Sequence, residues 1–200
     1  MGVDADPKVG VLALQGASEP HLAMLASMGV AAREVRRRED LEGLTHLILP
    51  GGESTTIRHL LDLFGLTDAI VARHRAGGLA LFGVCAGAIL LGRDDGVRPK
   101  RLGLLDARFT RNAYGRQIDS FTRESGILGR PFRCVFIRAP KVAEVGPGAR
   151  ILARDEGGEP ILVESADGTI LAATFHPELS GDDALHRRFL APRPASAATA

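Results

Sequence analysis

Short apolar runs alternate with amphipathic stretches along the first half of the chain. The continuous apolar run at 9–14 is typical of a central strand that is covered on both faces. Further strands are predicted at 30–35, 44–49 and 79–84. Helices are predicted over 19–28 with Ser18 as the cap and Gly29 at the end, from Ser54 or Thr55 onward, over 67–76, and directly after residue 85. This alternation predicts an α/β fold with an open, mostly parallel sheet flanked by helices.

The second half of the chain is richer in short strand patterns and turns. Strands are predicted at 104–109, 117–121, 133–138, 151–153, 160–164 and 170–175, with a hairpin turn at Asp167-Gly168. Asp182 or Asp183 is expected to cap a last helix that runs through Leu190. We expect one domain over 9–190, a flexible N-terminal segment at 1–8 and a disordered tail at 191–200.

Composition and charge exclude several functional classes. The chain has 200 residues, is 45% hydrophobic and carries a net charge of +1, which gives no reason to expect a nucleic acid or an anionic membrane as partner. No apolar segment is long enough to cross a bilayer. The basic run 36–38 is followed by Glu39-Asp40, which favours a solvated loop. The two cysteines lie in different predicted elements, so we expect no metal site and a reducing cytoplasm, with Cys134 in the core.

The segment Gly83-Val84-Cys85-Ala86-Gly87 is the strongest chemical signal in the chain. It joins a predicted strand to a predicted helix, as the nucleophile elbow of G-x-S-x-G enzymes does, with sulfur in place of oxygen. Glycines on both sides are expected to leave room for a substrate, and the helix N-terminus favours the thiolate form of Cys85. A small buried cysteine in a glycine-rich turn is an equally good interpretation of this segment alone.

A thiolate nucleophile needs a base and a group that orients the base. His176 ends the last predicted strand and is followed by Pro177-Glu178. Proline biases His176 toward an extended conformation, in which residues i and i+2 project to the same side, so Glu178 can accept a hydrogen bond from the imidazole. Cys85, His176 and Glu178 then form a Cys-His-acid triad. The alternative is an exposed turn at the end of a strand.

The other histidines give weaker signals. His46 is expected to be packed inside a strand and His59 and His74 to lie on helix surfaces, while His21 stays open and His186 falls in the last helix.

Three loops at strand ends are expected to converge. Gln15, Gly51-Gly52 and Cys85 each follow a predicted parallel strand, and ligands of such sheets bind beyond the carboxyl ends of the strands. The N–H of Ala86 is a candidate donor to a tetrahedral oxyanion, and the loop at 50–53 can supply a second N–H. This loop is no phosphate cradle, because no Gly-Lys-Ser/Thr follows it.

With these motifs in place, the chain resembles class I glutamine amidotransferases, which have a flavodoxin-like fold. More closely, it resembles the family of glutaminase subunits of pyridoxal 5′-phosphate synthase (PdxT/SNO). The segments that carry the resemblance are Leu14-Gln15-Gly16-Ala17, Pro50-Gly51-Gly52-Glu53-Ser54-Thr55-Thr56, Arg111-Asn112-Ala113-Tyr114-Gly115-Arg116-Gln117, Phe136-Ile137-Arg138-Ala139-Pro140 and Phe175-His176-Pro177-Glu178-Leu179.

The resemblance implies hydrolysis of L-glutamine to L-glutamate and ammonia through a glutamyl thioester on Cys85. It implies that His176 moves the proton, that Glu178 orients His176, and that Gln15 and Gly16 help to complete the oxyanion site. It also implies a set of glutamine-binding residues: Gly51, Gly52, Glu53, Arg111, Ile137 and Arg138.

The resemblance further implies a partner and no cofactor in this subunit. Family members pass ammonia to the lyase subunit of pyridoxal 5′-phosphate synthase, which forms the ring core of a large hetero-oligomer. The chain departs from the family at Glu19-Pro20, where Arg-Glu is usual, and this change bears on docking of the partner. A glutaminase that serves another synthase and a catalytically silent regulatory subunit are the two alternatives.

Overall fold

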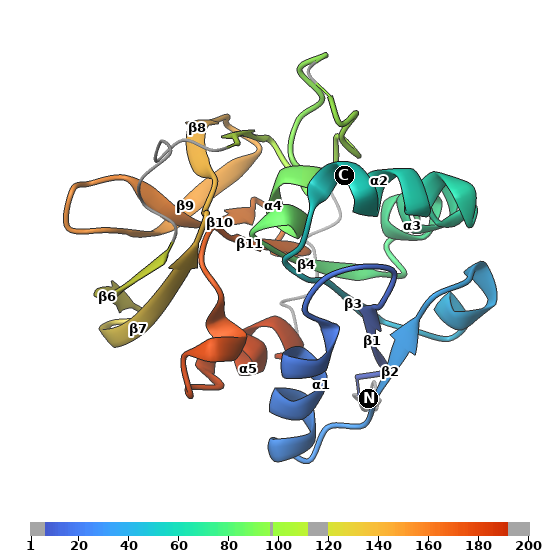
Figure 1. The fold of residues 1–200 in the computed structure, drawn as a ribbon, viewed down its shortest axis with the longest axis horizontal. Coiled ribbons are helices and arrows are strands. Elements are labelled where there is room, and N and C mark those ends of the chain that lie inside the picture. The colour runs from blue at the N-terminus through green and yellow to red at the C-terminus, as the bar shows by residue number, and fades with distance from the viewer. Residues whose placement is uncertain (1–6, 97, 112–119, 192–200) are drawn as a thin grey trace, which may run out of the picture.

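A seven-stranded sheet forms the centre of the molecule (Figure 1). The computed structural model describes residues 7–96, 98–111 and 120–191. In spatial order the strands are β2 (Ala32–Val35), β1 (Val9–Leu12), β3 (His46–Leu49), β4 (Ala80–Val84), β11 (Ile170–Ala173), β10 (Pro160–Ser165) and β9 (Ala149–Arg154). The first five are parallel to one another, and β10 and β9 continue the sheet antiparallel. The predicted open, mostly parallel α/β sheet is confirmed.

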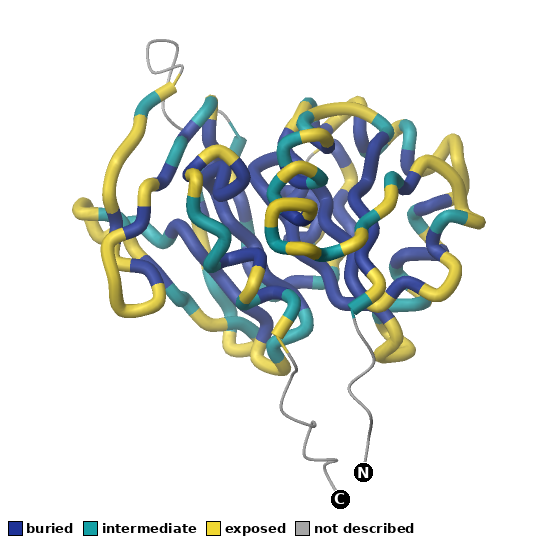
Figure 2. Tube along the Cα trace, turned by 90° about the horizontal axis from the view of Figure 1, so that it is seen from below, coloured by how far each residue is buried: buried dark blue, intermediate teal, exposed yellow. Residues whose placement is uncertain are grey.

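Helices cover both faces of the sheet because its central strands are apolar on both sides. Figure 1 shows α2 (Ser54–Leu63), α3 (Leu66–Arg75) and α4 (Ala86–Leu91) on one face, and α1 (Ser18–Ser27) and α5 (Ala184–Leu190) on the other. In β3, Leu47 and Leu49 belong to the core beneath α2, α3 and α4, and Ile48 belongs to the core beneath α1 and α5. The buried residues therefore concentrate in the central strands (Figure 2).

Two antiparallel strand pairs extend the second half of the chain. One pairs β5 (Ala107–Thr110) with β8 (Lys141–Val145), and the other pairs β6 (Ser120–Ile127) with β7 (Arg130–Ile137). The sequence indicated β5 and β7 with shifted ends, but it indicated only the first two residues of β6, and β8 was not predicted. The predicted hairpin turn at Gly168, where φ is +71°, joins β10 to β11.

Several local predictions were wrong in detail. Ser18 is the first residue of α1 and not its cap; the cap position is Ala17, which makes no side-chain capping bond. The prediction for the last helix is confirmed, because Asp183 occupies the cap position of α5, Oδ1 of Asp182 accepts the N–H of Ala184, and the helix ends at Leu190. Two short 3-10 helices were not predicted, η1 (Arg38–Leu41) and η2 (Pro177–Leu179). They escape sequence patterns because a single helical turn has no periodicity.

Some predictions concern residues outside the described ranges. These are the segment 112–117 of the resemblance, the start of the strand predicted at 117–121, and most of both terminal segments. Within the described ranges, no helix is both long and apolar enough to span a membrane.

The topology places four loops at one edge of the sheet. The strand order reverses between β1 and β3, and ligands of open parallel sheets bind at such a switch point. Gln15 follows β1, Gly51 follows β3, Cys85 follows β4 and His176 follows β11. The predicted convergence of these loops is therefore built into the strand order.

Candidate active site

Cys85 occupies a strained turn between β4 and α4. Its φ of 51° and ψ of −103° lie in a region that side chains rarely adopt. Such backbone strain typically costs about 1–3 kcal/mol and is found mainly at functional sites. The turn is held in place because the N–H of Cys85 donates to the carbonyl of Ala173 on β11, at 2.8 Å. The geometry is that of a nucleophile elbow.

The two glycines of the elbow are required by the protein's own backbone. A Cβ on Gly87 would overlap the carbonyl oxygen of Leu49 at the end of β3. A Cβ on Gly83 would lie 2.7 Å from backbone atoms of Gly87 and Ala88. The expectation that these glycines leave room for a substrate is therefore corrected: they allow β4 and α4 to pack closely against each other and against β3.

His176 and Glu178 form the predicted contact. Nδ1 of His176 lies 2.7 Å from Oε1 of Glu178, and both residues are buried. The N–H of His176 donates to the carbonyl of Val135 on β7 at 2.8 Å, which ties the end of β11 to the second strand pair. The extended segment assumed for this contact is wrong beyond His176, because Glu178 is brought back by the 3-10 turn of η2.

The electrostatics of this pair favour a charged imidazole. Burial lowers the pKa of His176, but the neighbouring Cys85 sulfur and the hydrogen bond and charge of Glu178 outweigh burial and raise the pKa to about 10. Burial opposes ionisation of Glu178 as well, and the hydrogen bond from His176 overcomes it, so the pKa of Glu178 is lowered. The hydrogen bond and the charge of Glu178 therefore favour an imidazolium at His176.

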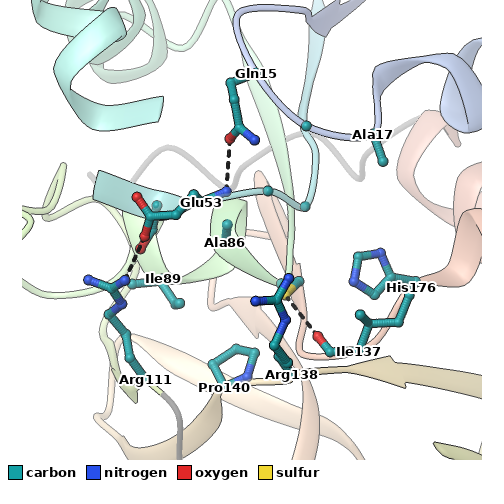
Figure 3. Close-up of a pocket in the computed structure, with 15 residues that line it drawn as sticks. Gln15, Ala17, Glu53, Ala86, Ile89, Arg111, Ile137, Arg138, Pro140 and His176 are labelled. Carbon is teal, nitrogen blue, oxygen red and sulfur yellow. Dashed lines mark hydrogen bonds and ion pairs between the residues drawn. The ribbon is translucent and has the colours of Figure 1, made fainter. Parts of the chain in front are cut away.

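The loops after β1 and β3 are locked together beside the imidazole. The N–H of Ala17 donates to the carbonyl of Gly51 at 3.0 Å. The N–H of Glu53 donates to Oε1 of Gln15 at 2.8 Å (Figure 3). Gly16 has φ +105°, and a Cβ on it would overlap the Gly51 carbonyl. Gly51 itself faces the ring of His176, where an added Cβ would overlap Cε1.

Glu53 and Arg111 form an ion pair at the edge of the cavity. Nη2 of Arg111 lies 2.6 Å from Oε1 of Glu53 (Figure 3). The other carboxylate oxygen of Glu53 accepts the N–H of Thr56 at 2.9 Å, which caps α2. Partial burial opposes ionisation, but hydrogen bonds from Thr55 and Thr56 outweigh it and lower the pKa of Glu53 to about 2. The two side chains are therefore held as a pair of opposite charges at the edge of the cavity.

The end of β7 and the residues directly after it form the remaining wall of the cavity. Sγ of Cys85 lies 3.9 Å from the carbonyl oxygen of Ile137. The next residue, Arg138, has a positive φ of 41°, and its exposed side chain lies beside the cavity (Figure 3). Arg138 is thus a second residue with a strained backbone near Cys85, and it directly follows the Ile137 carbonyl that faces the thiol. Such strain is found mainly at functional sites.

Together these residues enclose a cavity of about 510 Å³. Of the sequence-predicted site residues, all except Glu178 line it: Gln15, Gly16, Gly51, Gly52, Glu53, Cys85, Ala86, Arg111, Ile137, Arg138 and His176. Glu178 is buried and reaches the cavity only through His176. The cavity combines a thiol, an imidazole, backbone N–H groups at a helix start, and charged groups of both signs.

The remaining histidines and the second cysteine divide between structure and surface. His46 is buried against Phe189, His59 is exposed, and Cys134 is buried in the core, all as expected. His74 is half-buried and its Nδ1 lies 2.9 Å from the Leu79 carbonyl, so the surface placement expected for it was wrong. Burial raises the pKa of the Cys134 thiol to about 12.

His21 and His186 are the residues whose position the sequence did not reveal. Both are fully buried, with His21 next to Glu178. No pattern of spacing connects residues 165 positions apart, so only the tertiary structure brings them together. No group of three or more potential metal ligands is present among the described residues.

Comparison with known proteins gives a consistent result. The family model of the SNO glutamine amidotransferase family matches residues 11–192. A protein of Thermus thermophilus, "Pyridoxal 5'-phosphate synthase subunit PdxT", is 51% identical over 185 residues, covering 91% of this chain and 95% of that protein. A protein of the same name from Pelotomaculum thermopropionicum is 51% identical over 187 residues, covering 92% of this chain and 93% of that one.

A solved structure agrees with the sequence relatives. "Crystal structure of glutamine amidotransferase" superimposes with a TM-score of 0.86 at 49% identity and covers 91% of this chain and 96% of that one.

Proposed function

The chain belongs to the SNO glutamine amidotransferase family, and we propose that Cys85, His176 and Glu178 hydrolyse glutamine in the cavity described above. Its relatives are PdxT subunits that match more than nine-tenths of the chain at about half identity. The chain is accordingly the glutaminase subunit of pyridoxal 5′-phosphate synthase, acting in vitamin B6 biosynthesis. The observation that carries the residue assignment is the strained Cys85 elbow beside a buried imidazole that Glu178 holds at 2.7 Å.

In the first half-reaction Cys85 attacks the side-chain amide of glutamine. The thiolate sulfur forms a bond to the amide carbon, and the tetrahedral intermediate collapses to a glutamyl thioester as the C–N bond breaks. His176 donates its proton to the departing nitrogen, so ammonia leaves as a neutral molecule. Glu178 keeps the ring oriented and stabilises its charged form before the proton is transferred.

The second half-reaction releases the sulfur of Cys85 from the thioester. His176, now neutral, removes a proton from water, whose oxygen attacks the thioester. Glutamate leaves with the new oxygen, and the sulfur of Cys85 returns to the thiolate form beside the imidazolium.

The oxyanion of both tetrahedral intermediates needs fixed donors. The N–H of Ala86 opens α4, and the first amide groups of a helix have no acceptor within the helix. The N–H of Gly52 lies in the loop that Gln15 and Gly16 hold against the cavity. We assign the oxyanion to these two donors, each of which typically contributes about 3–4 kcal/mol to the transition state.

The charged residues Glu53, Arg111 and Arg138 fit the α-carboxylate and α-ammonium groups of an amino acid. Arg111 and Arg138 are suited to the α-carboxylate, and Glu53, with its low pKa, is ionised and suited to the α-ammonium group. Arg111 and Glu53 are paired with each other in the structure. When glutamine binds, its α-carboxylate pairs with Arg111 and its α-ammonium group pairs with Glu53. The site therefore favours a substrate that carries both charges.

The partner follows from the same identity. We expect the domain at 9–190 to dock on the lyase subunit of pyridoxal 5′-phosphate synthase, within a large hetero-oligomer that has a synthase ring at its core. Docking is expected to act on the loop of Gln15 and Gly16, which borders the cavity. We expect the complex in the cytoplasm, where the free thiol of Cys85 stays reduced.

The test is glutamate release from L-glutamine with and without the lyase subunit. We expect strong stimulation by the lyase subunit, and we expect Cys85→Ala to abolish release while the variant keeps the wild-type melting temperature. Full activity of Cys85→Ala would refute the nucleophile. A folded wild-type protein that is inactive in both conditions would favour a silent regulatory subunit, and stimulation by a different synthase would change the partner.

A further inference from the structure

Two fully buried histidines lie behind the triad and are not explained by the chemistry above. His21 lies on α1 and His186 on α5, and neither side chain is exposed to solvent. Nδ1 of His21 lies 3.0 Å from Nε2 of His186. Nε2 of His21 lies 3.5 Å from Oε2 of Glu178, the carboxylate oxygen that His176 does not use. A line of four polar side chains therefore runs from the cavity wall into the core.

The atoms that face each other between Glu178 and His21 lack other partners. Neither Oε2 of Glu178 nor Nε2 of His21 makes a hydrogen bond to any part of the chain that the structure describes. An unpaired buried carboxylate oxygen is energetically costly, and an adjacent imidazole N–H is the group that satisfies it. The two atoms are close enough that a small shift closes a hydrogen bond between them.

The charge of Glu178 determines where His21 carries its proton. A neutral imidazole has one N–H and one lone pair. With the proton on Nδ1, the lone pair of Nε2 would face an anionic oxygen at 3.5 Å, which is repulsive. With the proton on Nε2, His21 donates to Glu178, and its Nδ1 accepts the Nε2–H of His186. His186 then has its lone pair on Nδ1, the atom without a described partner.

We propose that His21 is a positioning residue of the triad, donating from Nε2 to Glu178, and that His186 fixes the tautomer of His21. This inference rests on the proposed function of the Cys85 site. Its consequence is that Glu178 is held at both oxygens, so its carboxylate plane cannot rotate. The orientation of the imidazole of His176 is then fixed by a group that never touches substrate, since His21 is not among the residues that line the cavity.

The surroundings keep both histidines neutral. Burial lowers the pKa of His21 to about 4, with Glu178 opposing and His176 adding to the effect. Burial and the neighbouring His21 lower the pKa of His186 to about 3, opposed by the charges of Glu178 and Asp183. Neutral rings have defined tautomers, which the donation to Glu178 requires.

A pair of substitutions separates positioning from packing. His21→Gln keeps an N–H donor near Glu178 and an acceptor for His186, whereas His21→Leu fills similar space without either group. In the complex with the lyase subunit we expect His21→Leu to lower kcat about 10-fold or more with KM nearly unchanged, and His21→Gln to recover most of that loss. His74→Leu, which removes a half-buried histidine bonded to the Leu79 carbonyl, is the matched control and should leave kcat unchanged.

The outcomes distinguish this inference from the proposed function. An inactive wild-type complex would contradict the glutaminase function itself. An active wild type with an unaffected His21→Leu variant, or with His21→Gln as slow as His21→Leu, would overturn the positioning role.

A measurement on the unaltered full chain covers the case in which His21→Leu does not fold. Nitrogen-15 NMR of histidine-labelled protein should show His21 and His186 as neutral Nε2–H tautomers at neutral pH. An Nδ1–H tautomer of His21, or a positively charged His21 ring, would overturn the proposal.

Discussion

Gly51→Ala is expected to disable the enzyme without unfolding it. The α-carbon of Gly51 faces the ring of His176, and an added Cβ would overlap Cε1 and lie 3.3 Å from both ring nitrogens. The ring cannot turn aside freely, because Nδ1 is held 2.7 Å from Glu178. It must withdraw as a whole, and a displacement of about 1 Å in a reacting group can lower the rate about 100-fold, or about 2.7 kcal/mol in the barrier.

The assay for Gly51→Ala is glutamate release in the presence of the lyase subunit, with unfolding followed in parallel. We expect kcat to fall about 100-fold while the melting temperature changes little. Gly126→Ala is the matched control, since no atom lies within 4 Å of its added Cβ and its φ is not positive. If Gly51→Ala kept the kcat of Gly126→Ala, the placement of His176 against this loop would be refuted.

Three further predictions test other parts of the structure. Arg111→Leu should raise KM for glutamine about 10- to 100-fold with a smaller effect on kcat, because it removes a charged hydrogen bond to the α-carboxylate; an unchanged KM would contradict binding of the α-carboxylate by Arg111. Gly87→Ala should lower the free energy of unfolding by about 1–3 kcal/mol in urea denaturation, because the new Cβ overlaps the fixed carbonyl of Leu49; unchanged stability would contradict the close packing of α4. Burial lowers the pKa of His186 in the folded protein to about 3, from 6.5 in the unfolded chain. The neutral buried ring therefore contributes fully to the free energy of unfolding above pH 6.5, and this contribution is lost as the pH falls below 6.5. Between about pH 6 and 4.5 the wild type should therefore lose up to about 1.4 kcal/mol more per pH unit than His186→Phe, and equal slopes in denaturation at several pH values would contradict a neutral buried ring.

The fold class was readable from the sequence because its elements obey simple periods. The apolar run at 9–14 and the helical period after Ser54 each report a local burial pattern, and the βα alternation then restricts the topology. Strand and helix ends were less accurate, since they depend on caps and on neighbours. Ser18 is typical of a cap, yet it became the first helical residue of α1 because Ala17 is held by the Gly51 carbonyl.

The site was only partly readable for a related reason. The contact between His176 and Glu178 was predicted from local spacing and is confirmed, although a 3-10 turn produces it. Arg111 and Arg138 carry no local signal and were selected only through the family resemblance. His21 and His186 could not be found at all, because their pairing depends on how α1 and α5 pack under the sheet.

The glycines of the site accommodate different kinds of neighbouring groups. Gly83 and Gly87 make room for backbone, whereas Gly51 makes room for the ring of His176. A pattern of glycines in the sequence indicates close approach but does not say what approaches.

The most direct test of the central claim is covalent labelling with a diazoketone analogue of glutamine, followed by peptide mapping. We expect a single label on Cys85, formed faster with the lyase subunit present and suppressed by glutamine. Glu178→Gln should slow labelling, because it weakens the support of the imidazolium beside the thiolate. A label on Cys134, or no label on a folded protein in the complex, would contradict the assignment of Cys85 as the nucleophile.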